Sequence, residues 1–201
     1  MNKFDYKKEL KHLYLPTANK FTIVDVPAMK FLMVDGTGNP NTSLDFQEAC
    51  NALYGMAYTI KFSNKPRGMD FTVPPLEGLW WMEDMTQFST GNKDQWLWTV
   101  MIMQPDFVSR EVVEQAADDL MRKKSPPALS KLRFETFHEG LSVQIMYFGA
   151  YADEGPTIAR MHEYILTQGY QRRGKHHEIY MGDPRRTTPE KLKTVIRQPI
   201  G

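Results

Sequence analysis

The segment from His176 to Tyr180 carries the side chains of this chain that are best suited to chemistry. Side chains alternate between the two faces of a strand, so His176, Glu178 and Tyr180 share one face. His177 and Ile179 point to the other face. If the Ile179 face packs under helices, Glu178 and Tyr180 face a ligand cleft. A partly desolvated carboxylate there would hold a cationic ligand or act as a general base with a raised pKa. An exposed strand glutamate without a function is the alternative.

Aromatic side chains are the second signal, because the chain has 11 Phe, 9 Tyr and 4 Trp together with 13 Met. Such residues fill cores, and they also line adaptable apolar pockets. Trp96 and Trp98 would share one strand face, whereas Trp80 and Trp81 would oppose each other. We expect at least one tryptophan to line the ligand cleft.

Metal and nucleotide motifs are absent from the sequence. The turn at Gly36-Thr37-Gly38 has Asn41 where a dinucleotide-binding fingerprint needs its third glycine, and no G-x-S-x-G motif occurs. Cys50 is the one cysteine and is expected to be a small buried residue. No H-E-x-x-H spacing occurs among His12, His138, His162, His176 and His177. We therefore predict no metal and no organic cofactor, with His176 as a candidate hydrogen-bonding residue of the pocket.

Charge and hydropathy point to a soluble cytoplasmic protein. The formal net charge is +1, from 25 basic and 24 acidic residues, which favours neither nucleic acid nor a membrane surface as a partner. The basic stretch 171–201 is expected to be a solvated surface, since no helix-turn-helix is visible. The apolar run 96–103 is too short to span a bilayer, and the charged residues 1–12 do not resemble a signal peptide. One cysteine fits a reducing compartment.

Apolar spacing and Gly or Pro punctuation predict the elements that position these residues. Helices are expected over 5–14, over 43–60 with a capping box at Thr42 and Asp45, from Ser109 onward, and from Pro156 to Gly169. Strands are expected over 21–34 with a break near Pro27, 71–73, 79–82, 96–103, 175–181 and 192–200. A hairpin is expected over 132–139 and 141–148, with its turn at Glu139-Gly140.

The same order of elements occurs twice. One sequence separation relates the pairs Phe21 and Phe134, Leu32 and Ile145, Met33 and Met146, and Gly36 and Gly149. This pattern predicts an α+β fold in which two similar units, about 21–123 and 132–201, pack as one domain with a ligand cleft at their junction.

The C-terminal motif resembles a known family. The stretches 174–186 (GKHHEIYMGDPRR), 189–194 (PEKLKT) and 197–200 (RQPI) look like the signature of GyrI-like small-molecule-binding proteins. Residues 5–10 (DYKKEL) together with Leu13-Tyr14 resemble the stand-alone subgroup of this family. This resemblance implies duplicated βαββ (SHS2-like) units in a single domain over 1–201, with an N-terminal helical extension over 1–16. Relatives serve as effector-binding domains of multidrug-responsive regulators, with an acidic residue at the Glu178 position in an aromatic drug pocket. About twenty residues precede the first expected strand here, too few for a DNA-binding domain.

Stand-alone members that this chain resembles include cyclopropanoid cyclopropyl hydrolases, which open the strained ring of DNA-alkylating compounds with water. Such a reaction needs a flat aromatic slot, a base for water and a proton donor for the developing phenolate. The resemblance suggests Glu178 as the base, and Tyr180 or Tyr147 as the donor. The candidate ligand-binding residues are Trp80, Trp98, Tyr54 and His176. The alternatives are a non-catalytic binder of planar or cationic drugs and a gyrase-inhibitor-like interaction protein.

Overall fold

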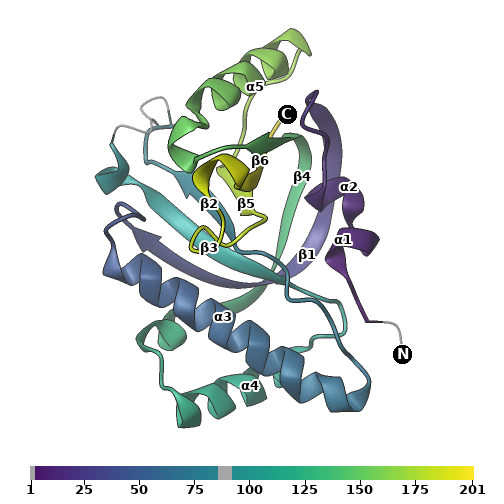
Figure 1. Ribbon diagram of the computed structural model, residues 1–201, viewed down its shortest axis with the longest axis vertical. Helices are drawn as coiled ribbons and strands as arrows, with labels where there is room; N and C mark the ends of the chain where they lie inside the picture. Colours follow the sequence, from purple (N-terminus) through teal and green to yellow (C-terminus); the bar gives the residue numbers. More distant parts are fainter. Residues whose placement is uncertain (1–2, 86–91) are drawn as a thin grey trace.

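A computed structural model describes residues 3–85 and 92–201, and within them six antiparallel strands form a closed barrel (Figure 1). The order around the barrel is β1-β3-β2-β5-β6-β4, and β4 closes it by pairing with β1. The strands are β1 (Thr22–Thr37), β2 (Glu77–Trp81), β3 (Leu97–Gln104), β4 (Arg133–Phe148), β5 (His176–Tyr180) and β6 (Lys193–Pro199). The predicted α+β class is confirmed.

Within the described residues, five α-helices accompany the barrel. They are α1 (Tyr6–Glu9), α2 (Lys11–Tyr14), α3 (Leu44–Asn64), α4 (Arg110–Lys123) and α5 (Gly155–Thr167). Short 3-10 helices are η1 (Lys65–Arg67), η3 (Lys93–Gln95), η4 (Pro127–Lys131), η5 (Tyr151–Asp153) and η6 (Pro189–Lys191). None of these helices is long and apolar enough to cross a bilayer.

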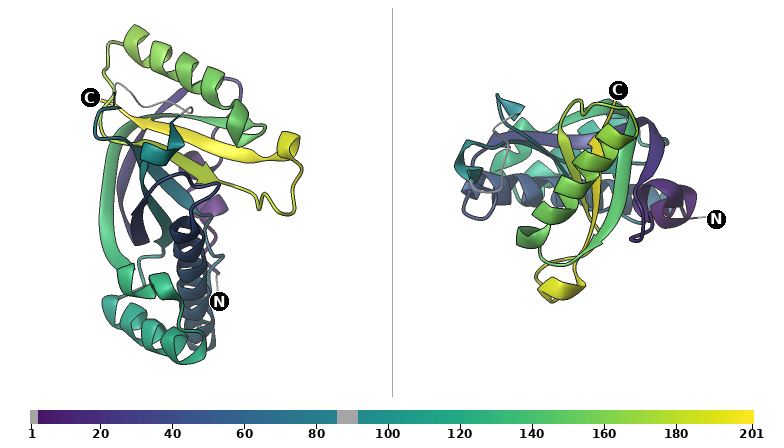
Figure 2. Two further views of the ribbon diagram at one scale, coloured as in Figure 1. Left: turned by 90° about the vertical axis from the view of Figure 1, so that its left-hand side faces the viewer. Right: turned by 90° about the horizontal axis from the view of Figure 1, so that it is seen from above.

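The helices bury different faces of the strands (Figure 2). The long helix α3 packs on the outer face of β1, β3 and β2, where Leu32, Val100 and Trp80 belong to one apolar cluster, and α4 packs against α3. Helix α5 packs separately on the outer face of β4 and β6. On the inner face, Tyr6, Leu13 and Tyr14 of α1 and α2 join a methionine-rich cluster with Phe31 and Ile179. Consequently β5 lies between the part of the outer face that α3 covers and the part that α5 covers.

Two predicted breaks in the long strands are wrong. The expected hairpin at Glu139-Gly140 is a single strand, since β4 continues from Arg133 to Phe148 and pairs with β1 from Thr22↔Gln144 to Met33↔Arg133. Gly140 has φ +73, so it bends the strand locally without reversing it. Strand β1 also continues through Pro27. The pairing of β1 with β3 begins only at Lys30, so the missing N–H of Pro27 removes no bond to that neighbour.

The other boundaries differ in detail. Ser109 caps α4 as predicted, whereas α3 is capped by Ser43, whose Oγ accepts the Phe46 N–H at 3.2 Å. The expected strand over 71–73 is reduced to one bridge between Phe71 and Phe4. The order strand–helix–strand–strand occurs twice, as β1-α3-β2-β3 and β4-α5-β5-β6. The predicted duplication stays a prediction, which superposition of the two halves would test.

Candidate functional site

The outer face of β5 carries a chain of hydrogen bonds that ends on Glu178. The Trp80 Nε1–H donates to the Tyr180 hydroxyl at 3.0 Å, and this hydroxyl donates to Oε2 of Glu178 at 2.8 Å. His176 Nε2 lies 3.1 Å from the other carboxylate oxygen, Oε1. The predicted alternation along β5 therefore holds, and it brings together four of the candidate site residues. The Glu178 side chain is only 13% exposed.

A glycine on β2 makes room for this arrangement. Gly78 pairs with Glu178 in the β2–β5 ladder, and a Cβ at Gly78 would lie 2.7 Å from Nε1 of Trp80. The indole thus lies over the glycine and reaches the Tyr180 hydroxyl. A larger residue at position 78 would push the ring away from that hydroxyl.

A second carboxyl group, which the sequence did not reveal, faces Glu178 from the start of α5. Glu154 is 2% exposed, and burial followed by the negative charge of Glu178 raises its pKa to about 9. Burial also acts to raise the pKa of Glu178, but interactions with His176, Tyr180 and Glu154 outweigh it, so this pKa is lowered. The raised pKa expected for Glu178 is therefore wrong for that residue. It is the neighbouring carboxyl group, Glu154, whose pKa is raised. At neutral pH the site holds one carboxylic acid next to one carboxylate.

Aromatic rings surround this carboxyl pair. The Tyr151 ring lies 5.3 Å from the Tyr180 ring, edge to face, and Trp80 lies 5.9 Å from Phe46 of α3. Tyr54 on α3 is 37% exposed, and its pKa is raised to about 12, chiefly by burial of its hydroxyl. These rings come from α3, β2, β5 and η5.

Two predicted site residues, Trp98 and Tyr147, make their main contacts with residues other than Glu178. Trp98 is buried on β3, packs edge-on against Phe46 at 5.3 Å, and lies over Gly36, where a Cβ would be 2.1 Å from the ring. The Tyr147 hydroxyl donates to the backbone carbonyl of Ala150 at 3.3 Å. Trp98 therefore contributes to the aromatic core behind Trp80, and Tyr147 supports the turn that leads to η5 and α5.

The inner face of the barrel holds a separate ionic network centred on His177. Its Nδ1 lies 2.9 Å from Oε1 of Glu139, and its Nε2 lies 3.1 Å from Oε2 of Glu77. Tyr14 donates to Glu77 at 2.7 Å, and Arg197 Nη1 donates to Glu139 at 3.1 Å. Burial opposes the charge on His177, but Glu139 and Glu77 raise its pKa to about 9. The network joins β2, β4, β5 and β6 to the N-terminal helices behind the candidate site.

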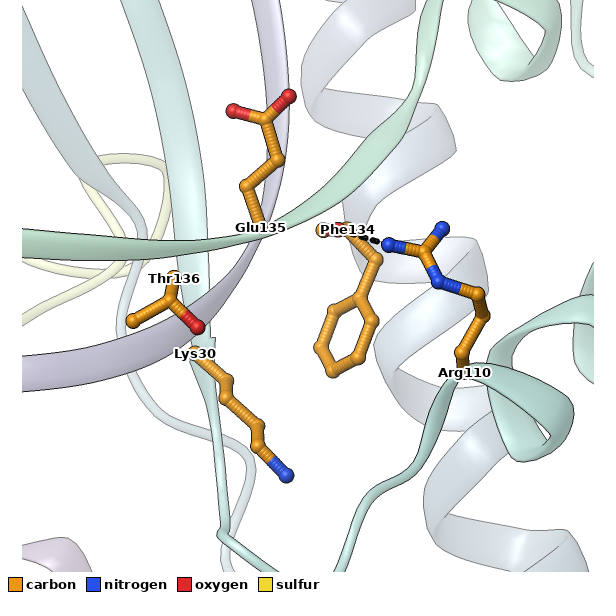
Figure 3. A pocket seen from close by; sticks show the side chains of 5 residues that line it. All are labelled: Lys30, Arg110, Phe134, Glu135 and Thr136. Atoms are coloured by element: carbon orange, nitrogen blue, oxygen red, sulfur yellow. Dashed lines mark hydrogen bonds between the residues drawn. The ribbon is translucent and has the colours of Figure 1, made fainter.

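A surface hollow of about 350 Å³ lies elsewhere, between α4 and the beginning of β4 (Figure 3). It is lined by Lys30, Arg110, Phe134, Glu135 and Thr136. The Lys30 ammonium already donates to the backbone carbonyls of Asp106 and Val108, at 2.8 and 3.0 Å. None of the predicted site residues lines this hollow.

Side chains for a metal or a nucleophilic thiol are not assembled in the described part of the chain. Across residues 3–85 and 92–201, no group of three or more His, Cys, Asp or Glu side chains could hold a metal ion. Burial raises the pKa of the Cys50 thiol to about 12, so it stays protonated at neutral pH. The carboxyl pair is thus the chemical feature of the site.

Sequence reasoning missed Glu154 because its position reads as an ordinary helix start. Glu154 is the N-cap of α5 and precedes Gly155-Pro156, yet its side chain makes no capping bond. An acidic N-cap followed by Pro at the first turn was the one available signal, and by itself it indicates only a helix start.

Several solved structures are similar to this chain in sequence and in fold. An uncharacterised conserved protein from Listeria innocua is 43% identical, with 99% of this chain and 100% of that chain covered and a TM-score of 0.92. Two structures described as hydrolases from Listeria innocua are 42% and 41% identical. They cover 100% and 99% of this chain and 100% of their own, with TM-scores of 0.90 and 0.87.

More distant relatives share the fold alone. The C-terminal domain of EcmrR is 11% identical, with 94% of this chain and 98% of that chain covered and a TM-score of 0.57. No curated protein matches the chain. Residues 19–200 match the GyrI-like small molecule binding domain, and the chain therefore belongs to this family of small-molecule-binding proteins.

Proposed function

We propose that the protein is a hydrolase that adds water to the strained ring of cyclopropanoid compounds. One observation carries the proposal: Glu154 and Glu178 face each other in a buried aromatic setting with pKa values shifted in opposite directions. Neighbouring carboxyl groups whose pKa values are pushed apart are typical of an acid and a base in one site. The description of two similar Listeria proteins as hydrolases supports an enzymatic role.

The reaction assigns one step to each carboxyl group. Glu178, ionised at neutral pH, accepts a proton from water as the water oxygen bonds to a cyclopropane carbon. A ring carbon–carbon bond breaks, and its electron pair moves through the conjugated dienone to the carbonyl oxygen, which becomes a phenolate. Glu154 gives its proton to this oxygen. The net reaction is the addition of one water molecule to the substrate. Transfer of a proton from Glu178 to Glu154 then restores the protonation states that the two carboxyl groups had before the reaction.

We assign the proton donor to Glu154 rather than to either tyrosine, because its pKa of about 9 is lower than the raised pKa values of Tyr180 and Tyr147. Glu178 accepts hydrogen bonds from both Glu154 and Tyr180, and the Tyr147 hydroxyl donates to the Ala150 carbonyl. Burial, followed by the charge of Glu178, also raises the pKa of Tyr180 well above its usual value. Tyr180 then orients the Glu178 carboxylate, while Trp80, Tyr54 and Tyr151 supply flat apolar surface for a planar ligand.

The test is turnover with substoichiometric protein. Incubation with a spirocyclopropyl dienone should give more than one equivalent of the hydrated, ring-opened phenol. Glu178→Gln should lower the rate by roughly 10²–10⁴-fold, the usual contribution of a general base. Glu163→Gln, an exposed change on α5, is the matched control and should leave the rate unchanged. Turnover that survives Glu178→Gln would contradict the assignment.

Sequestration of a planar cation is the second candidate function. An ionised Glu178, hydrogen-bonded to Tyr180 and close to the aromatic residues Trp80 and Tyr151, is suited to a cationic ring system. In that case the dienone is consumed by at most one equivalent. Glu178→Gln should then weaken the binding of a planar cationic dye such as ethidium and leave the affinity for a neutral planar ligand unchanged.

A further inference from the structure

One half of strand β4 has a free edge. Strand β6 pairs with β4 only over 142–148, whereas β1 pairs with β4 over 133–144. Within residues 3–85 and 92–201, the segment 133–138 of β4 therefore has a neighbouring strand on one side alone. In the left view of Figure 2, this part of β4 lies at the margin of the molecule. A free strand edge is a template for pairing with another chain, and proteins usually protect it.

The corresponding half of β1 is protected, but this half of β4 is not. Strand β3 pairs with β1 only from Lys30 onward, so in the described part of the chain the beginning of β1 also has a free edge. Pro27 lies within that edge, and a proline has no N–H with which to bind an added strand. The segment 133–138 (RFETFH) holds no proline. Of the two edges, the one on β4 is therefore the one that can accept a strand.

The backbone of Phe134 points toward this open edge. Its carbonyl accepts a long 3.5 Å hydrogen bond from Nη2 of Arg110, at the start of α4 (Figure 3). In an extended strand, the N–H and C=O of one residue point to the same side, and the direction repeats every second residue. The N–H groups of Phe134 and Thr136 therefore both face outward. Arg110 is exposed, so its guanidinium can leave this long contact when a better donor arrives.

The two neighbours of Phe134 carry opposite charges on the inner face of β4. Arg133 Nε donates to Oε2 of Glu135 at 2.9 Å, yet the two side chains are 31% and 53% exposed and can reach a further strand. If a second copy of β4 pairs antiparallel about Phe134, the Arg133 of each copy lies opposite the partner's Glu135. The edge is thus complementary in charge to itself. The net charge of the whole chain, +1, opposes association only weakly.

Two hollows on the outer face offer room for the side chains of a second strand. Each has a volume of about 350 Å³, and both are lined by Arg110, Phe134 and Glu135. The first extends to Thr136, and the second extends to Leu132. In a pairing about Phe134, the two Phe134 rings meet, and Leu132 of one copy lies opposite Thr136 of the other. Apolar side chains then fill hollows that are otherwise open to water.

We propose that this edge binds a second copy of the chain, with the two β4 strands antiparallel about a two-fold axis at Phe134. The Phe134 N–H of each copy donates to the partner's Phe134 carbonyl, and each Thr136 N–H donates to the partner's Leu132 carbonyl. On the inner face, the Arg133 and Glu135 side chains of both copies form a ring of alternating charges. The interface does not depend on the proposed hydrolase activity, because none of the candidate site residues lines the two hollows.

Sedimentation equilibrium of the full chain tests the interface. The unmodified protein should be a dimer at micromolar concentration. Thr136→Pro removes an N–H that faces away from β1, so it spares the β1–β4 ladder and should raise the dissociation constant roughly 10-fold or more. Thr136→Val keeps the N–H and is the matched control, with an unchanged dissociation constant. A monomer at about 100 μM, or a dimer that Thr136→Pro leaves intact, would overturn the proposal.

Mixing two charge variants tests the pairing about Phe134. In an Arg133→Glu dimer two carboxylates face each other, and in a Glu135→Lys dimer two cations do, so each variant alone should dimerise roughly 10-fold more weakly. An equimolar mixture brings opposite charges together at both positions and should form heterodimers as tightly as the unmodified protein. A mixture that stays monomeric would overturn this pairing. If Arg133→Glu does not fold, since its carboxylate would face Asp35, the comparison of Thr136→Pro with Thr136→Val decides the question.

Discussion

Replacement of Glu154 by glutamine should stabilise the protein at neutral and alkaline pH. The pKa of this carboxyl group is raised from 4.5 to about 9, so the folded protein keeps a proton that the unfolded chain has lost. The free energy of unfolding therefore falls as pH rises between these two values. Glutamine has the shape of the neutral acid and no proton to lose, so the variant should lack this dependence.

The magnitude follows from the pKa difference. At pH 7.5 the unfolded group is about three pH units above its pKa, and each unit corresponds to about 1.4 kcal/mol, so holding the proton costs the folded state about 4 kcal/mol. The variant should regain up to that amount at pH 7.5 and nothing below pH 4.5. Urea denaturation across this pH range, with Glu163→Gln on the same helix as the control, measures the difference.

A stability difference that does not change with pH would refute the reasoning, because the effect would then be one of packing. A variant less stable than the original protein at pH 7.5 would also refute it. The same change should lower turnover of the dienone, since an amide cannot give up a proton to the substrate oxygen. Gain of stability with loss of activity is the usual result when a strained group belongs to a functional site.

Three further predictions concern the barrel. Tyr14→Phe leaves Glu77 without its 2.7 Å donor and should lower the free energy of unfolding by about 1–3 kcal/mol in thermal denaturation; an unchanged melting temperature would contradict the network. The pKa of His177 is raised from 6.5 to about 9, so its stabilising contribution is complete below 6.5 and is lost as pH rises through 9. His177→Gln should therefore make denaturation less dependent on pH above 6.5, and an unaltered alkaline slope would argue against this. Gly78→Ala should displace Trp80 from its hydrogen bond, change tryptophan fluorescence and slow turnover, whereas an unchanged spectrum would show that the indole tolerates the methyl group.

Local sequence alone determined the features that depend on neighbouring residues. Strand alternation predicted that Glu178 and Tyr180 share a face opposite His177, and a two-residue period leaves no other arrangement in an extended chain. The start of α4 at Ser109 was also predictable, because a serine hydroxyl satisfies a free backbone N–H at a helix start. The family signature over the C-terminal strands is likewise a property of the sequence, and the match over residues 19–200 confirms it.

Tertiary structure decided the features that depend on distant partners. Gly140 reads as a turn, but the long ladder between β1 and β4 keeps the strand running through it. Glu154 reads as a helix cap, but the packing of α5 brings it to Glu178 on β5. The pKa of a carboxyl group depends on burial and on the charges around it, and neither is encoded in its immediate neighbours. This is why the sequence predicted Glu178 as a candidate site carboxylate, while the raised pKa of its neighbour Glu154 follows only from contacts made in the folded chain.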